Sequence, residues 1–178
     1  MLEYDPYALL QELKPMGTFS LTSRDVQHGH QLARPQWGAG AGGRDESPQL
    51  SWTGFPPNTV SFAVTCLDPD APSGSGWWHW AVANIPAAVT SLDTDAGAAG
   101  GARLPGGALT LPNDDGERRY SGPTPPHGTG VHRYFFVVTA LNVPRLAVGP
   151  DATPAVLGMR LYFHGIARGI LIGNASGD

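Results

Sequence analysis

The sequence predicts a mainly β fold, a two-layer antiparallel β-sandwich with short peripheral helices and a C-terminal helix. The chain of 178 residues contains 24 glycines and 17 prolines, which favours many turns and loops over a helical bundle. Short apolar runs, several of them alternating, are separated by long loops rich in proline and glycine, as in antiparallel two-layer proteins. The length fits a single domain covering residues 1–178, large enough to fold without a disulfide or a metal.

A short amphipathic helix is predicted near the N-terminus. Asp5 is a suitable N-cap and Pro6 suits the first helical position. Apolar residues recur at helical spacing from Tyr7 to Leu13, and Lys14-Pro15 ends the pattern.

The strand signals follow and strengthen along the chain. Two runs stand out because they are apolar on both faces, which indicates burial on both sides of a sheet. The glycine-rich segment 34–48 lacks a phosphate-loop lysine and is interpreted as a flexible connection, and 96–107 as a glycine- and alanine-rich loop. The predicted strands are 19–22, 49–53, 59–68, 77–85 and 133–141.

The last element is predicted to be a helix over residues 155–172. Thr153 is a suitable cap, Pro154 suits the first position, and Gly173 ends the apolar pattern of 3.6-residue period.

This helix would place Arg160, His164 and Arg168 on one ridge. The ridge is either a solvated or interface-facing stripe, which we favour, or part of an anion site.

Composition excludes several classes of protein. The net charge is −4 and the basic residues are scattered, which argues against a surface for nucleic acid or anionic membranes. No apolar run is long enough to span a bilayer, and the first 30 residues do not resemble a signal peptide, so a cytoplasmic location is expected. The single cysteine, Cys66, lies in an alternating apolar run and is expected to be a buried, inert thiol.

Polar side chains cluster at the ends of the predicted strands. Asp68 and Asp70 begin a loop stiffened by proline, in which Ala71-Pro72 is a candidate cis bond, and His79 lies inside the next strand. A proline-rich loop then leads into a strand whose alternation places His132 and Tyr134 on one face and Arg133 on the other. Two imidazoles, a phenol and loop N–H groups could surround a phosphate-sized anion without any basic patch.

These motifs resemble the phosphatidylethanolamine-binding protein family, and most closely its bacterial and archaeal branch called Raf-kinase-inhibitor-like. The resemblance runs from about Phe19 to the C-terminal helix. It is carried by DPDAP (68–72), GSGWWHWAVANIP (74–86), NDDG (113–116) and YSGPTPPHGTGVHRY (120–134).

The resemblance implies a Greek-key arrangement of the two sheets and a small cavity that takes phosphate, phosphorylethanolamine, acetate or cacodylate. It implies a cis Ala71-Pro72 bond and no required cofactor or metal, and by analogy a homodimer. Neither Tyr162 nor His164 can be assigned the role of the tyrosine that a C-terminal helix places over the pocket in eukaryotic members. Carried over position by position, the cavity residues are Asp68, Asp70, His79, His132 and Tyr134, with Pro72, Gly122 and Pro123 at the rim.

The predicted function is therefore the binding of a small anion, a phosphate or a phosphorylated head group. His79 and His132 would donate to the anion while Asp68 or Asp70 fixes a histidine tautomer, and binding would be best at mildly acidic pH. No catalytic residue is assigned.

Three alternatives remain open. One is a weak hydrolase using Ser121, which has no nucleophile-elbow motif around it. Another is a metal site formed by Asp70, His79 and His132. The third is a regulatory protein with a vestigial pocket, because the resembled family includes inhibitors of serine carboxypeptidases and kinases, so a protease or kinase is a candidate partner.

Overall fold

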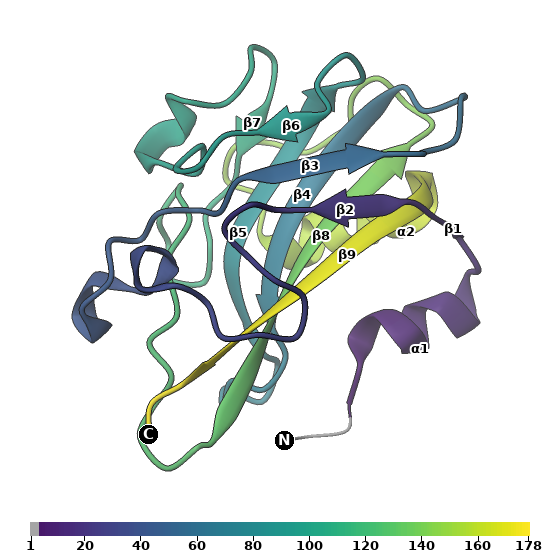
Figure 1. Ribbon diagram of the computed structural model, residues 1–178. Helices are drawn as coiled ribbons and strands as arrows, with labels where there is room; N and C mark the ends of the chain where they lie inside the picture. The colour runs from purple at the N-terminus through teal and green to yellow at the C-terminus, as the bar shows by residue number, and fades with distance from the viewer. Residues whose placement is uncertain (1–3) are drawn as a thin grey trace.

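The computed structural model describes residues 4–178, which form two β-sheets and two α-helices (Figure 1). The six-stranded sheet has the order β1 (Gly17–Thr18), β9 (Gly165–Ser176), β8 (Val131–Leu141), β4 (Ser61–Asp68), β5 (Trp77–Pro86) and β7 (Leu109–Thr110). The three-stranded sheet has the order β2 (Ser20–Thr22), β3 (Leu50–Thr53) and β6 (Ser91–Leu92). The helices are α1 (Pro6–Leu13) and α2 (Pro154–His164). Short 3₁₀ turns occur at Arg34–Gln36, Ala39–Ala41 and Ala99–Gly101.

The three-stranded sheet covers one face of the large sheet, and α2 lies behind the large sheet (Figure 1). Neighbouring strands are antiparallel except for the short β1–β9 pair, which is parallel. The prediction of a mainly β fold with two sheets and few helices is confirmed. The Greek-key description of the sandwich remains a prediction.

Strand β4 is buried along its whole length because it lies between β5 and β8 and is covered on both faces. Its side chains alternate between two cores, as the period of a strand requires. Phe62, Val64 and Cys66 pack in the core between the sheets, where Trp52 of β3 meets the Phe62 ring with 5.4 Å between centroids. Ala63 and other odd-numbered residues face the helices. The predicted burial of Cys66 is confirmed, and burial raises the pKa of its thiol.

Helix α1 forms where the sequence predicts it. The Asp5 carboxylate accepts hydrogen bonds from the N–H groups of Tyr7 (2.8 Å) and Ala8 (3.1 Å), two donors that otherwise have no partner in the first turn. The helix ends before Lys14, whose ammonium donates to three carbonyls at the end of α2, those of Tyr162, Phe163 and Gly165. A cation at a helix C-terminus is favourable, so Lys14 fastens the two helices together.

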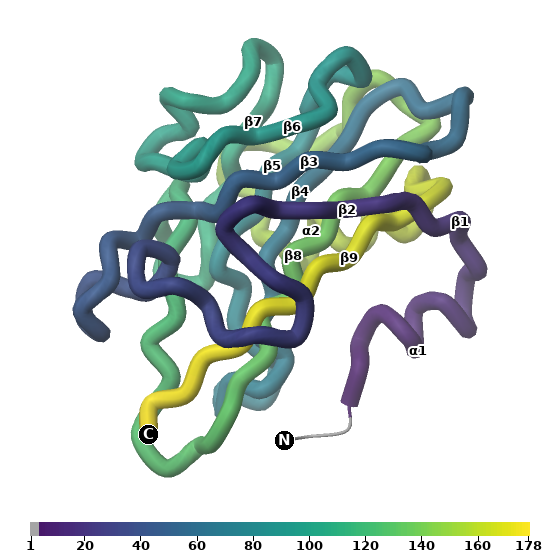
Figure 2. The backbone as a smooth tube through the Cα atoms, viewed as in Figure 1, coloured from purple at the N-terminus to yellow at the C-terminus, as the bar shows by residue number. Residues whose placement is uncertain are grey.

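The predicted C-terminal helix over 155–172 is wrong in its second half. The helix ends at His164, and Gly165–Ser176 forms β9, which pairs with β8 along almost its entire length (Figure 2). Gly165, Gly169 and Gly173 weaken a helix, and on a strand they leave room for packing. A Cβ atom at Gly173 would lie 2.4 Å from Cδ2 of Leu32. The expected helical ridge therefore does not exist, and Arg168 lies in β9.

The candidate cis bond at Ala71-Pro72 is not found, since residues 4–178 contain no cis peptide bond. The turn is tightened by other means. The Asp70 N–H donates to Oδ1 of Asp68 over 2.8 Å, the Ser73 N–H donates to the Ala71 carbonyl, and Gly76 adopts a positive φ of 74°. The hydrogen bond from the Asp70 N–H to the Asp68 carboxylate therefore allows a tight turn in which Pro72 keeps a trans peptide bond.

The orientation of α2 predicts that alanine substitutions at two adjacent residues lower the free energy of unfolding by different amounts. Leu157 is fully buried against the sheet, whereas Val156 is 45% exposed. Replacing Leu157 by alanine is expected to lower the free energy of unfolding by about 2–5 kcal/mol in urea denaturation. The control Val156→Ala is expected to change it by about 0.5 kcal/mol or less. Equal losses would contradict the packing of α2.

Candidate functional site

A cavity of about 390 Å³ opens at one end of the large sheet, which is within the size range of small-molecule pockets. Strands β4, β5 and β8 contribute its floor, and two proline-containing loops contribute its walls. The lining residues are Asp68, Ala71, Pro72, Ser73, Trp77, His79, Asp115, Gly122, Thr124, Pro125, Pro126, His132 and Tyr134.

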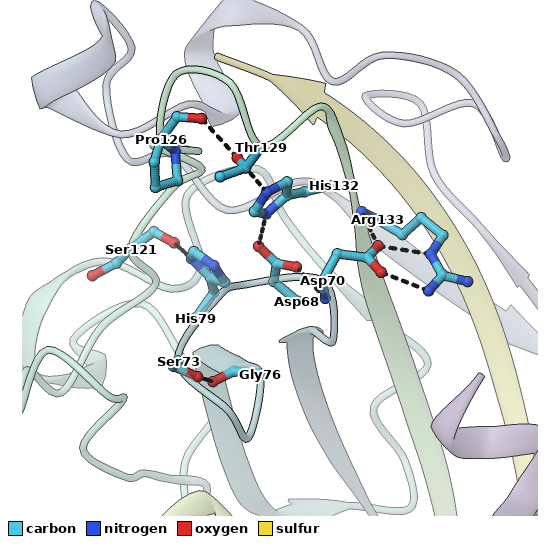
Figure 3. Close-up of polar contacts among 10 residues, drawn as sticks. All are labelled: Asp68, Asp70, Ser73, Gly76, His79, Ser121, Pro126, Thr129, His132 and Arg133. Carbon is cyan, nitrogen blue, oxygen red and sulfur yellow. Dashed lines mark hydrogen bonds and ion pairs between the residues drawn. The ribbon is translucent and has the colours of Figure 1, made fainter. Parts of the chain in front are cut away.

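The centre of the cavity floor is a hydrogen bond between Asp68 and His132 (Figure 3). Asp68 is the last residue of β4, and its Oδ2 lies 2.8 Å from Nδ1 of His132; both side chains are almost completely buried. A carboxylate only accepts, so Nδ1 of His132 carries the proton. On the other side of the ring, Nε2 lies 2.8 Å from Oγ1 of Thr129, which also lies 2.7 Å from the carbonyl of Pro126.

The second imidazole, His79, is oriented by the backbone. Its Nδ1 lies 2.7 Å from the carbonyl oxygen of Ser121, and a carbonyl can only accept, so Nδ1 again carries the proton (Figure 3). Nε2 of His79 has no hydrogen-bond partner within residues 4–178. Burial lowers the pKa of His79, a trend that the Ser121 carbonyl and the nearby Asp68 carboxylate partly oppose.

Tyr134 completes the polar floor of the cavity. Alternation along β8 brings it to the same face as His132, and its ring meets the edge of the His79 ring with 5.1 Å between centroids. Burial, followed by the proximity of the Asp68 carboxylate, raises the pKa of the phenol well above its ordinary value. The hydroxyl therefore stays protonated and can donate a hydrogen bond.

Two of the predicted site residues do not line this cavity, Asp70 and Pro123. The Asp70 carboxylate faces Arg133, with both oxygens 2.7 Å from guanidinium nitrogens and Oδ2 3.0 Å from the Arg133 N–H (Figure 3). Burial raises the pKa of Asp70, but these hydrogen bonds outweigh burial and hold it below its ordinary value. It is Asp68, and not Asp70, that contacts a histidine ring.

The remaining predicted residues, Asp68, Pro72, His79, Gly122, His132 and Tyr134, all line the cavity. Sequence reasoning missed several others, including Trp77, Asp115 and the segment 124–126, although each lies within or beside a motif that was noticed. Thr129 was missed as well, and only its three-residue spacing from His132 could have indicated the contact.

The wall at Gly122 depends on a close approach between two backbones. A Cβ atom at Gly122 would lie 2.3 Å from the carbonyl oxygen of Gln36, so only glycine fits. The Gly122 N–H donates to Asp45 over 2.7 Å, and the Gly38 N–H donates to the Pro123 carbonyl over 2.9 Å. The segment 34–48, expected to be a flexible connection, is thus packed against the cavity wall.

The geometry bears on two of the alternatives. No group of three His, Cys, Asp or Glu side chains suited to a metal ion occurs among residues 4–178, and Asp70 is turned toward Arg133 rather than toward the histidines. The Ser121 hydroxyl accepts a hydrogen bond from the Asn113 amide over 2.8 Å, while His79 contacts only the Ser121 carbonyl. The structure therefore offers no Ser–His hydrogen bond at this serine.

No helix of the described part of the chain is both long and apolar enough to cross a membrane. One relative, from Mycobacterium tuberculosis, bears the name lipoprotein LppC; it is 33% identical over 118 residues, 64% of this chain and 54% of that protein. A cytoplasmic location accordingly remains a prediction.

Comparison with known proteins places these observations in a family. Among curated proteins, YbcL of Escherichia coli is 45% identical over 151 residues, covering 84% of this chain and 82% of YbcL. YbhB of the same organism is 42% identical over 149 residues, covering 83% of this chain and 93% of YbhB.

Solved structures agree with the sequence relatives. The crystal structure of E. coli YbcL, described as a new member of the mammalian PEBP family, matches with a TM-score of 0.86 and 42% identity over 90% of this chain and 99% of that one. A PEBP homologue from Chlamydia trachomatis, CT736, matches with a TM-score of 0.76 and 29% identity over 91% of this chain and 99% of that one. The family model described as phosphatidylethanolamine-binding protein matches residues 22–176. The chain therefore belongs to the phosphatidylethanolamine-binding protein family.

Proposed function

We propose that the protein binds a small oxyanion of the phosphate-monoester type in the cavity formed around His79, His132 and Tyr134. The observation that carries this proposal is the convergence of two imidazoles and a protonated phenol on one 390 Å³ cavity. Membership of the family supports it.

Proton accounting identifies the group that would meet the ligand. The Thr129 hydroxyl has one proton and cannot donate both to the Pro126 carbonyl and to Nε2 of His132. When His132 carries a second proton, Nε2–H donates to Thr129 and Thr129 donates to Pro126, so the chain is fully paired without a ligand. The Nε2 edge of His79 has no such partner among residues 4–178, and we assign it to the oxyanion. The Tyr134 hydroxyl lies beside the Asp68 carboxylate and would turn from it to donate to the oxyanion.

The cavity walls contain few hydrogen-bond donors, so an anion would depend on the side chains of the floor. Pro72, Pro125 and Pro126 have no backbone N–H, and the N–H groups of Ser73 and Gly122 already donate to Ala71 and Asp45, so the loops around the cavity offer few free donors to an anion. Binding then depends on a protonated His79, and it couples to the uptake of a proton.

The carboxylates near the cavity favour a zwitterionic ligand over inorganic phosphate. Asp115 lines the cavity and is exposed, so its negative charge repels a simple anion and attracts an ammonium group. Phosphorylethanolamine carries a phosphate for the imidazole side and an ammonium for Asp115. An exposed ion pair contributes about 0.2–1 kcal/mol, so a preference of about 1.4- to fivefold is expected.

The tautomers of the two histidines can be tested without any ligand. At mildly alkaline pH, long-range proton–nitrogen NMR spectra are expected to show His79 and His132 both protonated at Nδ1, because Ser121 and Asp68 offer only acceptors. The solvent-exposed His127 serves as an internal reference. An Nε2–H tautomer at either residue would contradict the geometry.

Titration with phosphorylethanolamine tests the proposed function. Because free His79 has a lowered pKa and binding takes up a proton, affinity is expected to rise by at most about tenfold for each unit by which the pH falls. The rise ends near pH about 6, where the phosphate itself takes up its second proton. His79→Asn is expected to abolish this pH dependence, whereas His127→Asn leaves it unchanged.

Asp115→Asn is expected to remove the preference for phosphorylethanolamine over phosphate in the same titration. If neither anion shifts the imidazole resonances of the wild-type protein, or if His79→Asn binds as the wild type does, the proposed function is wrong.

The lowered pKa of His79 also makes the free energy of unfolding depend on pH. The unfolded chain binds a proton at His79 near pH 6.5 and the folded protein only at lower pH, so stability is lost as the pH falls below 6.5. One proton gives a slope of at most about 1.4 kcal/mol per pH unit. In phosphate-free urea denaturation, the difference between wild type and His79→Asn is expected to follow this slope; a flat difference would argue against the burial of a neutral His79.

A further inference from the structure

A second cavity lies on the opposite face of the large sheet from the first. Its volume is about 490 Å³, within the range of small-molecule sites. The sheet provides the floor and the helices α1 and α2 provide the walls. The floor residues are Thr65, Leu67, Trp78, Thr139 and Arg168; Tyr7, Leu10, Leu13, Met159, Leu161 and Tyr162 are among the wall residues.

The unusual feature of this cavity is Arg168. It lies in β9 opposite Thr139, and only 7% of its surface is exposed. Within residues 4–178 no carboxylate lies within ion-pair distance of its guanidinium. The carbon of the guanidinium lies 5.8 Å from the centre of the Tyr7 ring. Arg133, which is less buried, is by contrast paired with Asp70. A buried charge is costly unless something pairs with it.

Another cation near the cavity, Lys14, is already occupied. Its ammonium donates to the carbonyls of Tyr162, Phe163 and Gly165, where it closes the end of α2. An anion entering between the helices would therefore meet, among the charges of residues 4–178, the unpaired guanidinium of Arg168. A planar guanidinium matches a carboxylate through two parallel hydrogen bonds.

The mouth of the cavity is apolar and exposed. Leu13 is 65% exposed and Met159 57%, and both line the cavity; Phe163, 59% exposed, follows on α2. Exposed apolar side chains on facing helices, above the guanidinium of Arg168, match a ligand with a charged head and a hydrocarbon tail. A protein partner would cover the mouth, but a broad surface reaches a guanidinium on the cavity floor less well than a narrow chain does.

We propose that this cavity is a second ligand site that binds a single-chain amphipathic carboxylate, with its head group on Arg168 and its hydrocarbon chain between α1 and α2. The proposal is independent of the oxyanion cavity on the other face.

The test is calorimetric titration of the full chain with octanoate, decanoate and dodecanoate below their micelle concentrations, and with decanol as the uncharged analogue. Affinity is expected to rise roughly fourfold for each added methylene group, as burial of hydrocarbon requires. Arg168→Met, which keeps the apolar stem, is expected to weaken decanoate binding by about tenfold or more and to leave decanol binding unchanged. Arg160→Met, an exposed arginine of α2 that does not line the cavity, is the matched control and is expected to bind both as the wild type does.

Unchanged decanoate binding by Arg168→Met, or no dependence on chain length, would overturn the proposal. So would loss of decanoate binding in His79→Asn, because that result would place the ligand in the first cavity. If Arg168→Met does not fold, intermolecular NOEs in the wild-type protein decide: contacts from decanoate to the Leu13 and Met159 methyl groups support the site, and their absence rejects it. A dimer that forms through this face while no carboxylate binds would also reject it.

Discussion

The hydrogen bond between the Asp68 carboxylate and Nδ1 of His132 joins the end of β4 to the start of β8 and fixes the loops attached to both. The other oxygen of Asp68 accepts from the Asp70 N–H and so turns the chain away from β4. Nε2 of His132 holds Thr129 and, through it, the loop that ends at β8. Leaving a buried polar group without its hydrogen-bond partner typically costs about 1–3 kcal/mol, a sizeable part of a domain's stability of about 5–15 kcal/mol. The shape of the cavity and the stability of the fold are therefore set by the same contact.

The large sheet keeps two chemistries apart by the two-residue period of its strands. In β8, His132 and Tyr134 face the cavity of 390 Å³, while Arg133 between them faces the helices. There its guanidinium lies 5.5 Å from the Phe135 ring, pairs with Asp70 and donates to the Tyr4 carbonyl just before α1. Neighbouring residues of one strand thus serve the cavity on one face and the anchoring of α1 on the other.

Local patterns in the sequence predicted the N-terminal helix and, together with the family resemblance, six of the residues that line the cavity. The alternation of β8 places His132 and Tyr134 together, and Asp68 at a strand end is within reach of an imidazole. The direction of Asp70 could not be predicted in this way, because it depends on Arg133, a residue far along the chain that the fold brings next to it. The same holds for the segment 34–48, whose packing against Gly122 depends on two backbones that meet only in the folded protein.

The C-terminal segment has a hydrophobic spacing that is compatible with both a helix and a strand. Ile166 and Ile170 are four residues apart, a spacing that suits one face of a helix and one face of a strand alike, and the long pairing with β8 decides for the strand. The decision changes the meaning of Arg168. On a helix it would share a solvated ridge with Arg160, but in β9 it lies opposite Thr139 on the face that α1 and α2 cover. A residue that looks like ordinary surface charge in the sequence is therefore a buried cation at the floor of an apolar cavity, and it became visible only when tertiary pairing overruled helical periodicity.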